Sequence, residues 1–352
     1  MGTIIVVGTP TRSTLTENRW SQLCVISYIL RVGKESCGRS EGLKAVVTGG
    51  TGFIGSHVVD LLSAKGYEVT VIDIQPPGDY WDVPAGVEVL KLDVATPECE
   101  NFIANYRPDV VFHLAARASV VESVHNPHED ARTTIQGLLH VLEGARKAQT
   151  KKVVFSSTAA VYGDSNVVLP IVEEAAVAPI SPYGASKLAA EHYLQVYQQL
   201  HHLDYAILRY ANVYGPRQGI AGEGGVIAIF AKATHVGTPL SLFGNGMHTR
   251  DYIYVQDVAR ANLMAAEHDG SVLLNISTGV ETSNRRLIEL MQDVSGRMIH
   301  VQEEPERQGD ILRSALAPHK AHSVIDFKSA VDIHSGLHAT YRWMEDWSLY
   351  ES

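Results

Sequence analysis

The amino-acid sequence predicts a doubly wound α/β fold, in which helices cover both faces of a parallel sheet. Two observations support this prediction. From Leu43 onwards, short runs rich in β-branched residues alternate with amphipathic stretches, and these runs are apolar on both faces. A glycine-rich turn follows the first run and precedes the first amphipathic stretch, which is where a dinucleotide-binding turn lies in this type of fold.

The strands of the predicted sheet are expected in the runs LKAVVTGG, YEVTVID, VEVLKLD, DVVFHLAA, KKVVFSS and YAILRYA. After Gly215 this rhythm gives way to a glycine-rich loop, a helix near 226–237 and a mixed C-terminal region. We therefore expect a nucleotide-binding domain over 43–214, with a returning segment around 250–278. A smaller mixed α/β lobe is expected over 215–249 and 279–352. Residues 1–42 lack this alternation of strand-like and amphipathic runs, and we interpret them as an extension of unassigned role.

Composition and charge exclude several function classes. The net charge of the 352-residue chain is −10, from 29 basic and 39 acidic residues without long runs of one sign, which argues against a nucleic-acid partner. Cys24, Cys37 and Cys99 form neither a CxxC pair nor a metal-ligand spacing, so we expect a reducing compartment, no disulfide and no metal. The apolar run LCVISYIL is too short to cross a bilayer. A cytoplasmic protein without a membrane partner is expected.

The glycine-rich turn VVTGGTGFIGSHVV places Gly49, Gly52 and Gly55 between a strand and a helix, with the spacing GxxGxxG. Glycines allow a pyrophosphate to approach the backbone, and the helix N-terminus offers N–H donors. Asp73 ends the second run where a carboxylate can accept from the adenosine ribose, and no arginine follows it, which favours NAD over NADP. Asp93 follows the third run, where adenine would lie. A turn role remains open for both aspartates.

Tyr183 and Lys187, in the stretch YGASK, are candidates for proton transfer. Their i,i+4 spacing puts the phenol and the ammonium on one helix face, where the ammonium favours the phenolate form that can act as a base. An exposed tyrosine and a solvated lysine are the ordinary alternative for this pattern. The position of the pair downstream of the glycine-rich turn and of the stretch SSTAAVYG favours the catalytic interpretation.

The chain resembles the extended short-chain dehydrogenase/reductase family, in its NAD-dependent nucleotide-sugar epimerase/dehydratase branch. The resemblance rests on TGGTGFIG, HLAARASV, SSTAAVYG, YGASK, RYANVYGPRQ, GNGMHTRDYIYVQDVA and ERQGDI, in this order from Leu43 to about Trp347. The stretch NVYGPRQ is most similar to that of UDP-glucose (UDP-galactose) 4-epimerases.

The resemblance implies NAD as cofactor, a UDP-sugar as substrate and roles for particular residues. Thr158 matches the hydroxyl that contacts the sugar O4, Tyr183 matches the base, and Lys187 matches the residue that holds the nicotinamide ribose. The implied cofactor-binding residues are Gly49, Gly52, Phe53, Ile54, Gly55, Asp73, Asp93, Val94, Leu114, Ala115, Ala116, Ser156, Tyr183, Lys187 and Tyr210. The implied substrate-binding residues are Ser119, Thr158, Asn212, Val226, Phe243, Arg250, Arg307, Asp310 and Ser314.

Within the implied substrate set, Asn212, Arg250 and Arg307 match the residues that bind the diphosphate, and Asp310 matches a ribose contact. Taken singly, each arginine is as well explained by a solvated ion pair. Arg209 and Arg217 are interpreted as structural.

Some positions depart from the family pattern. Thr134 replaces the usual asparagine near the nicotinamide, Leu138 replaces a threonine, and His248 stands where glutamine or tyrosine is common. The C-terminal GWxP signature is reduced to IDFKSA. These departures bear on substrate preference more than on the class of reaction.

The residues that follow Thr158 select among the reactions of the family. The resemblance implies that dehydratases carry an Asp-Glu pair there and that decarboxylases carry a glutamate, whereas this chain has Ala159 and Ala160. Alanines cannot exchange a proton, which leaves 4-epimerisation. Ser314 leaves room for an N-acetyl group at the sugar C2, although an ordinary loop serine explains it equally.

Other functions remain alternatives: a nucleotide-sugar 4-ketoreductase or dehydrogenase, a UDP-glucuronate 4-epimerase, or a non-catalytic NAD-binding sensor. The segments 131–147 and 186–201 carry apolar faces that pair across a two-fold axis in this family, so a homodimer is expected.

Overall fold

The computed structural model describes residues 42–164, 168–219, 225–306 and 311–348, all within one compact unit, Ser40–Ser352. The expected extension 1–42, with Cys24 and Cys37, therefore lies almost entirely outside the described residues. Cys99 is a buried free thiol. Among the described residues, no helix has the length and apolar character needed to cross a membrane, and no cluster of ligating side chains could hold a metal ion.

A seven-stranded parallel sheet forms the larger lobe, in the order β10-β6-β5-β4-β1-β2-β3. Its strands are β1 (Lys44–Thr48), β2 (Glu68–Asp73), β3 (Glu88–Lys91), β4 (Val110–His113), β5 (Lys152–Thr158), β6 (Asp204–Tyr210) and β10 (Val272–Ile276). The six predicted runs all become strands of this sheet, and β10 adds the seventh. The winding direction changes between β1 and β4, and such a switch point is where ligands bind outside the carboxyl ends of the strands.

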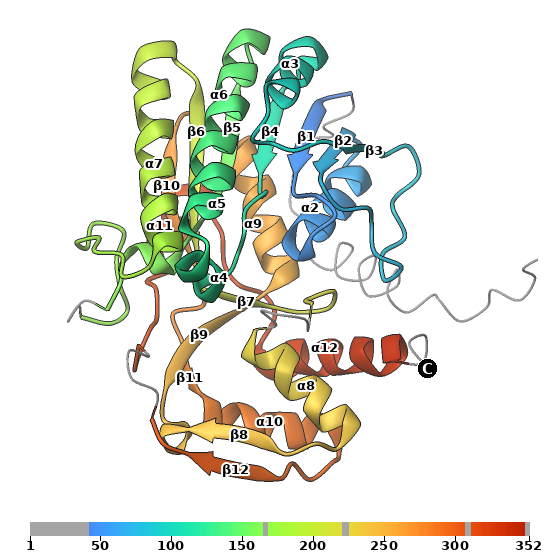
Figure 1. Cartoon of the computed structure of the whole chain (residues 1–352), viewed down its shortest axis with the longest axis vertical. Coiled ribbons are helices and arrows are strands. Elements are labelled where there is room, and N and C mark those ends of the chain that lie inside the picture. The colour runs from blue at the N-terminus through green and yellow to red at the C-terminus, as the bar shows by residue number, and fades with distance from the viewer. Residues whose placement is uncertain (1–41, 165–167, 220–224, 307–310, 349–352) are drawn as a thin grey trace, which may run out of the picture. The chain divides into compact units, whose positions relative to one another are not determined.

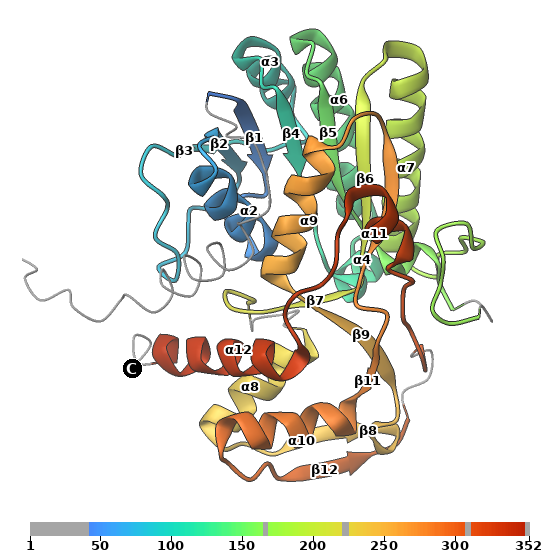
Figure 2. The same ribbon diagram turned by 180° about the vertical axis from the view of Figure 1, so that it is seen from behind.

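Helices cover both faces of this sheet, as Figures 1 and 2 show from opposite sides. On one face lie α3 (Pro97–Tyr106), α6 (Gly137–Ala148) and α7 (Pro182–His201), and on the other lie α2 (Phe53–Ala64), α9 (Val255–Glu267) and α11 (His319–Ile325). The apolar residues of each strand point alternately into these two layers. Val46 therefore packs in one core and Val47 in the other, with both side chains fully buried. This two-sided burial explains why the strands read as continuous apolar runs.

Short elements follow the ends of the central strands. After β4 come α4 (Val120–His125), α5 (Pro127–Ala131) and a π-helical turn, Arg132–Gln136, which runs directly into α6. A single 3₁₀ turn, Ala159–Val161, follows β5. The long helix α7 begins with Pro182 at its first position, and the Ser181 hydroxyl accepts a hydrogen bond from the Gly184 N–H.

The smaller lobe has its own apolar core. It contains α8 (Val226–Val236), β8 (Leu240–Phe243), a 3₁₀ turn (Gly244–Gly246), α10 (Asn284–Ser295), β12 (Val301–Glu304) and α12 (Ile333–Ser348). Strands β8 and β12 pair in parallel. A three-stranded sheet of β7 (Asn212–Tyr214), β9 (Thr249–Tyr254) and β11 (Glu281–Ser283) joins the two lobes.

Two segments are placed differently from the sequence-based division. Strand β9 pairs with β7 and β11, so within 250–278 it is α9 and β10 that join the large sheet. In the range assigned to the smaller lobe, Leu316, Ala321 and Phe327 are buried in the core of the large sheet. The reason is that α11 packs against β10, which buries these apolar side chains before α12 rejoins the smaller lobe.

Candidate active site

A cavity of about 1030 Å³ opens at the carboxyl ends of the large sheet and reaches the smaller lobe. Its walls come from the end of β5, the start of α2, α7, β7, β9 and the segment 311–314. This is the position where an open parallel sheet binds its ligand, and the volume is that of a ligand larger than a single sugar.

The glycine-rich turn lies between β1 and α2, and two of its glycines are required by close contacts. A Cβ atom on Gly49, which has φ of 70°, would lie 2.6 Å from the backbone nitrogen of Ala115, and one on Gly55 would lie 2.1 Å from the Gly49 carbonyl oxygen. Helix α2 begins after Gly52 with no capping side chain and no acidic residue in its first turn. A turn with this shape and open N–H groups fits the pyrophosphate of a dinucleotide.

The two predicted adenosine-side carboxylates have different surroundings. Asp73 ends β2, and its side chain accepts from the backbone nitrogens of Thr51 and Gln75, both at 3.1 Å. The turn thus holds Asp73 beside the glycines. Asp93 accepts from Ala95 N at 2.9 Å and pairs with Arg132, also at 2.9 Å. Both aspartates therefore order turns, and this role does not conflict with the cofactor contacts predicted for them.

The other predicted cofactor positions surround this turn and the cavity. Phe53, Ile54, Tyr183 and Tyr210 line the cavity. Leu114 and Ala115 follow β4 and lie directly beside Gly49, and Ala116 is the next residue of the chain. Ser156 lies in β5, and Val94 is buried against Gly137.

Two of the three predicted catalytic residues line the cavity, and the third is buried next to one of them. Thr158, the last residue of β5, and Tyr183, in the first turn of α7, both line it. Lys187 is buried one turn after Tyr183, and its ammonium lies 5.9 Å from the centre of the Tyr183 ring. The ammonium donates to the Ser156 carbonyl oxygen at 2.7 Å. Burial lowers the pKa of Lys187 to about 7, against the opposing effect of Asp130 and Glu191.

Arg209 and Arg217 are bound to acidic residues outside the cavity wall. Arg209 forms two hydrogen bonds to Glu191, at 2.9 Å and 2.6 Å, and both side chains are buried. Arg217 pairs with Asp60 of α2 at 2.7 Å. Both arginines connect separate elements of the fold, as their structural interpretation predicts.

The structure brings only part of the predicted substrate set to the cavity. Asn212, Arg250 and Ser314 line it, from β7, β9 and the segment after 311. Ser119 instead caps α4 by accepting from Glu122 N at 2.9 Å. Val226 and Phe243 lie at the start of α8 and the end of β8, and the described cavity lining does not include them. Arg307 and Asp310 lie outside the described residues.

Several lining residues were not singled out from the sequence. They include Asp164, Val168, Leu169, Gln218 and Arg313. Gln218 belongs to the stretch NVYGPRQ, so the sequence motif could have identified it as a residue near the site. Arg313 forms two hydrogen bonds to Glu281, which places its guanidinium at the cavity wall by a contact that no local pattern reveals.

The three departures from the family pattern are all buried. Leu138 packs in the core between α6 and the sheet. The imidazole Nε2 of His248 lies 3.6 Å from the carboxylate of Glu306. The Thr134 hydroxyl, on the π-helical turn, has no hydrogen-bond partner among the described residues.

Comparison with known proteins identifies the class. The profile of the NAD dependent epimerase/dehydratase family matches residues 45–277, which covers most of the large sheet and the cavity. The chain belongs to this family.

Individual relatives match along nearly their whole length. A protein of Methanocaldococcus jannaschii named "Putative UDP-glucose 4-epimerase" is 38% identical over 302 residues, which are 86% of this chain and 98% of the relative. The structure of UDP-glucose 4-epimerase from Thermotoga maritima with UDP-glucose is 40% identical, with a TM-score of 0.84 over 87% of this chain and 100% of the other. The Thermus thermophilus UDP-glucose 4-epimerase with NAD is 39% identical, with a TM-score of 0.80 over 86% and 99%.

Proposed function

We propose that this protein is an NAD-dependent UDP-sugar 4-epimerase that interconverts UDP-glucose and UDP-galactose. The observation that carries the proposal is that Thr158 and Tyr183 line one cavity together with two alanines, while the buried Lys187 ammonium lies 5.9 Å from the centre of the Tyr183 ring. The names of the relatives in Thermotoga maritima and Thermus thermophilus support the same substrate and cofactor.

The mechanism assigns one task to each of these side chains. Bound NAD supplies an acceptor, and later a donor, for the hydride of the sugar C4. Tyr183, as phenolate, takes the proton of the O4 hydroxyl as the hydride leaves, and it returns this proton when the hydride comes back to the opposite face. The Lys187 ammonium favours the phenolate, and the Thr158 hydroxyl orients O4. The reaction is redox-neutral because the same hydride leaves and returns.

The cavity wall next to Thr158 argues against elimination of water. Ala159 and Ala160 line the cavity at this point and carry no acid or base. Asp164 is the acidic side chain in the described lining, and it is exposed to solvent. A dehydratase needs a second acid and base at C5 and C6, so we expect Asp164→Asn to keep its epimerase activity.

The test compares two tyrosines of the same helix. Tyr183→Phe is expected to lower kcat for UDP-galactose by about 10²- to 10⁴-fold, as loss of a general base does. Tyr197→Phe removes a hydroxyl that donates to Glu143 of α6, outside the described cavity lining, and is the matched control, with activity unchanged. Products are identified by NMR from a panel of UDP-sugars that includes UDP-glucuronate and the N-acetylated pair, and the NAD content of each variant is measured.

The result also separates the alternatives. Net change in nicotinamide absorbance during turnover would indicate a ketoreductase or dehydrogenase. Full activity of Tyr183→Phe at wild-type NAD content would refute the assigned mechanism. Bound NAD without any product from the panel would favour the sensor.

We also propose a homodimer, formed through α4 and α7. Val120, Val121 and Val124 on α4 and Tyr193, Val196 and Leu200 on α7 are exposed, and the two helices pack against each other. These positions form an apolar surface of the kind that associates with another protein.

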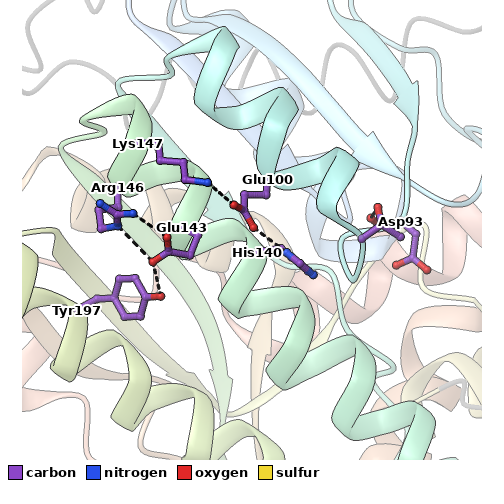
Figure 3. A network of polar contacts seen from close by, with 8 residues as sticks. Asp93, Glu100, His140, Glu143, Arg146, Lys147 and Tyr197 are labelled. Atoms are coloured by element: carbon purple, nitrogen blue, oxygen red, sulfur yellow. Dashed lines mark hydrogen bonds and ion pairs between the residues drawn. The ribbon is translucent and has the colours of Figure 1, made fainter.

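The outer face of α6, which the sequence also suggested, is polar. Figure 3 shows Glu100 of α3 between His140 and Lys147 of α6, and Glu143 bound to Arg146 and Tyr197. The apolar residues of α6 are buried in the core of its own subunit, so this helix adds little to an apolar interface.

A further inference from the structure

Lys187 is a charged side chain in an environment that disfavours charge. It is 1% exposed, and its ammonium lies over the Phe155 ring at 4.7 Å from the centroid. Its ammonium donates to the carbonyl oxygen of Ser156 at 2.7 Å and to the Ser156 hydroxyl at 3.4 Å, which satisfies two of its three N–H groups. A buried ammonium is stable only when an opposite charge compensates for its lost hydration. The question is which group supplies that charge.

Three titratable groups around Lys187 supply no unpaired negative charge. Glu191, one turn further along α7, also raises the pKa of Lys187, but two hydrogen bonds from Arg209 of β6 already bind its carboxylate. His113 of β4 is neutral, because burial lowers its pKa to about 3. Tyr210, at the end of β6, is also neutral, because burial raises the pKa of its phenol. Strand β5 contributes Phe155 and Ser156, which carry no charge.

Asp130 is the other negative group that stabilises the charged form of Lys187, with the larger effect of the two. It lies on α5, which packs against α7, and it is 1% exposed. Among the described residues, neither oxygen of its carboxylate has a hydrogen-bond partner. Its negative charge stabilises the charged form of Lys187. The two buried ionic groups therefore compensate each other at a distance, beside the hydrogen-bonded pair of Arg209 and Glu191.

The local backbone shows how Asp130 reaches this position. The π-helical turn Arg132–Gln136 begins two residues after Asp130 and packs against α7. Such turns are rare and are concentrated at functional sites. A fully buried carboxylate without a hydrogen bond lowers stability, so its presence on a helix that packs against the helix of the predicted catalytic lysine calls for a functional reason.

We propose that Asp130 is a positioning residue of the epimerase reaction, the buried counter-charge that keeps Lys187 protonated and thereby keeps Tyr183 ready as phenolate. This inference rests on the proposed function. Asp130 does not line the cavity and acts through Lys187. Removal of its negative charge makes the ammonium lose its proton at a lower pH.

The kinetic test is the pH profile of kcat/KM for UDP-galactose. Asp130→Asn keeps the shape of the side chain and removes the charge. The alkaline limb of the pH profile reports loss of the Lys187 proton, and in Asp130→Asn we expect this limb to move about one unit towards lower pH. One unit is the smaller end of the pKa shift that a neighbouring opposite charge causes. Glu129→Gln is the matched control. It removes the same charge from the neighbouring position, where the carboxylate is partly exposed and paired with Arg132, so its profile should stay in place.

A second measurement does not depend on activity. The protein with bound NAD is labelled with ¹³C-lysine, and the Lys187 signal is assigned by its loss in Lys187→Met. The pKa of Lys187 is then read from an NMR titration. We expect the pKa of Lys187 in the Asp130→Asn variant to be lower than in the wild-type protein by about one unit. Asp130→Ala serves as a second neutral variant if the asparagine variant does not fold.

The two measurements have distinguishable failures. Absence of epimerase activity in the wild-type protein would refute the proposed function, while the NMR titration would still test the counter-charge. An unchanged pKa of Lys187, or a uniform loss of rate without movement of the alkaline limb, would show that Asp130 has only a structural role and would overturn the inference.

Discussion

Replacement of Arg209 by methionine tests the buried ion pair beneath the active site. In the folded protein the guanidinium makes two hydrogen bonds to Glu191 and a third, at 2.9 Å, to the Tyr162 hydroxyl. The charged ends of the pair are only 5% and 2% exposed. Arg209→Met leaves Glu191 as a buried carboxylate without its counter-charge. We expect the free energy of unfolding to fall by about 3–5 kcal/mol, the usual cost of breaking a buried pair from one side.

The matched control removes an arginine from a surface pair. Arg286 and Glu289 lie three residues apart on α10, and their side chains are 58% and 55% exposed. Arg286→Met should lower the free energy of unfolding by at most about 0.5 kcal/mol, because solvent screens the pair. Urea unfolding followed by circular dichroism gives both values. A difference between the two variants below about 1 kcal/mol would refute the assignment of Arg209 as a buried structural cation.

Three further predictions concern pH, specificity and assembly. Burial lowers the pKa of both His57 and His113 to about 3, so below pH 6.5 the unfolded chain binds more protons than the folded protein. The free energy of unfolding, measured by urea titration, should therefore fall by about 3 kcal/mol from pH 6.5 to pH 5. Ser314→Tyr should lower turnover of UDP-N-acetylglucosamine relative to UDP-glucose by about tenfold, because the larger side chain fills the cavity; an unchanged ratio contradicts this. Leu200→Asp should give a monomer in analytical ultracentrifugation, whereas Val280→Asp, at an exposed site of the other lobe, should not.

The large sheet was predictable because its signal is local. The central strands are buried on both faces, so a run such as AVV in β1 is apolar throughout, whereas the amphipathic helices between the strands alternate apolar and polar residues. The glycine-rich turn was predictable for a similar reason. The close approach of Gly49 to Ala115 depends on the turn that joins β1 to α2, and the spacing of three glycines in the sequence predicts this turn.

Contacts between distant segments were not predictable in the same way. The return of 315–327 to the large sheet depends on the buried carboxylate of Asp251, which accepts from Thr278 N, Gly279 N and Leu316 N. Leu316 lies 65 positions after Asp251, so no periodic pattern connects them. Asp130 is a similar case. The charged residues Glu129 and Arg132 lie close to it in the sequence, and its burial becomes visible only where α5 packs against α7.

Thr158 combines a structural and a chemical role, which accounts for the residues beside it. Its hydroxyl oxygen accepts from Ala160 N at 3.2 Å and so caps the 3₁₀ turn that follows β5. A hydroxyl has two acceptor positions and one donor, so the cap leaves the Thr158 proton available to the sugar O4. The cap also orients the turn so that Ala159 and Ala160 face the cavity. Acidic residues at positions 159 and 160 would lie where a dehydratase needs an acid and a base. The epimerase interpretation therefore depends on the methyl groups of Ala159 and Ala160 as much as on the Thr158 hydroxyl.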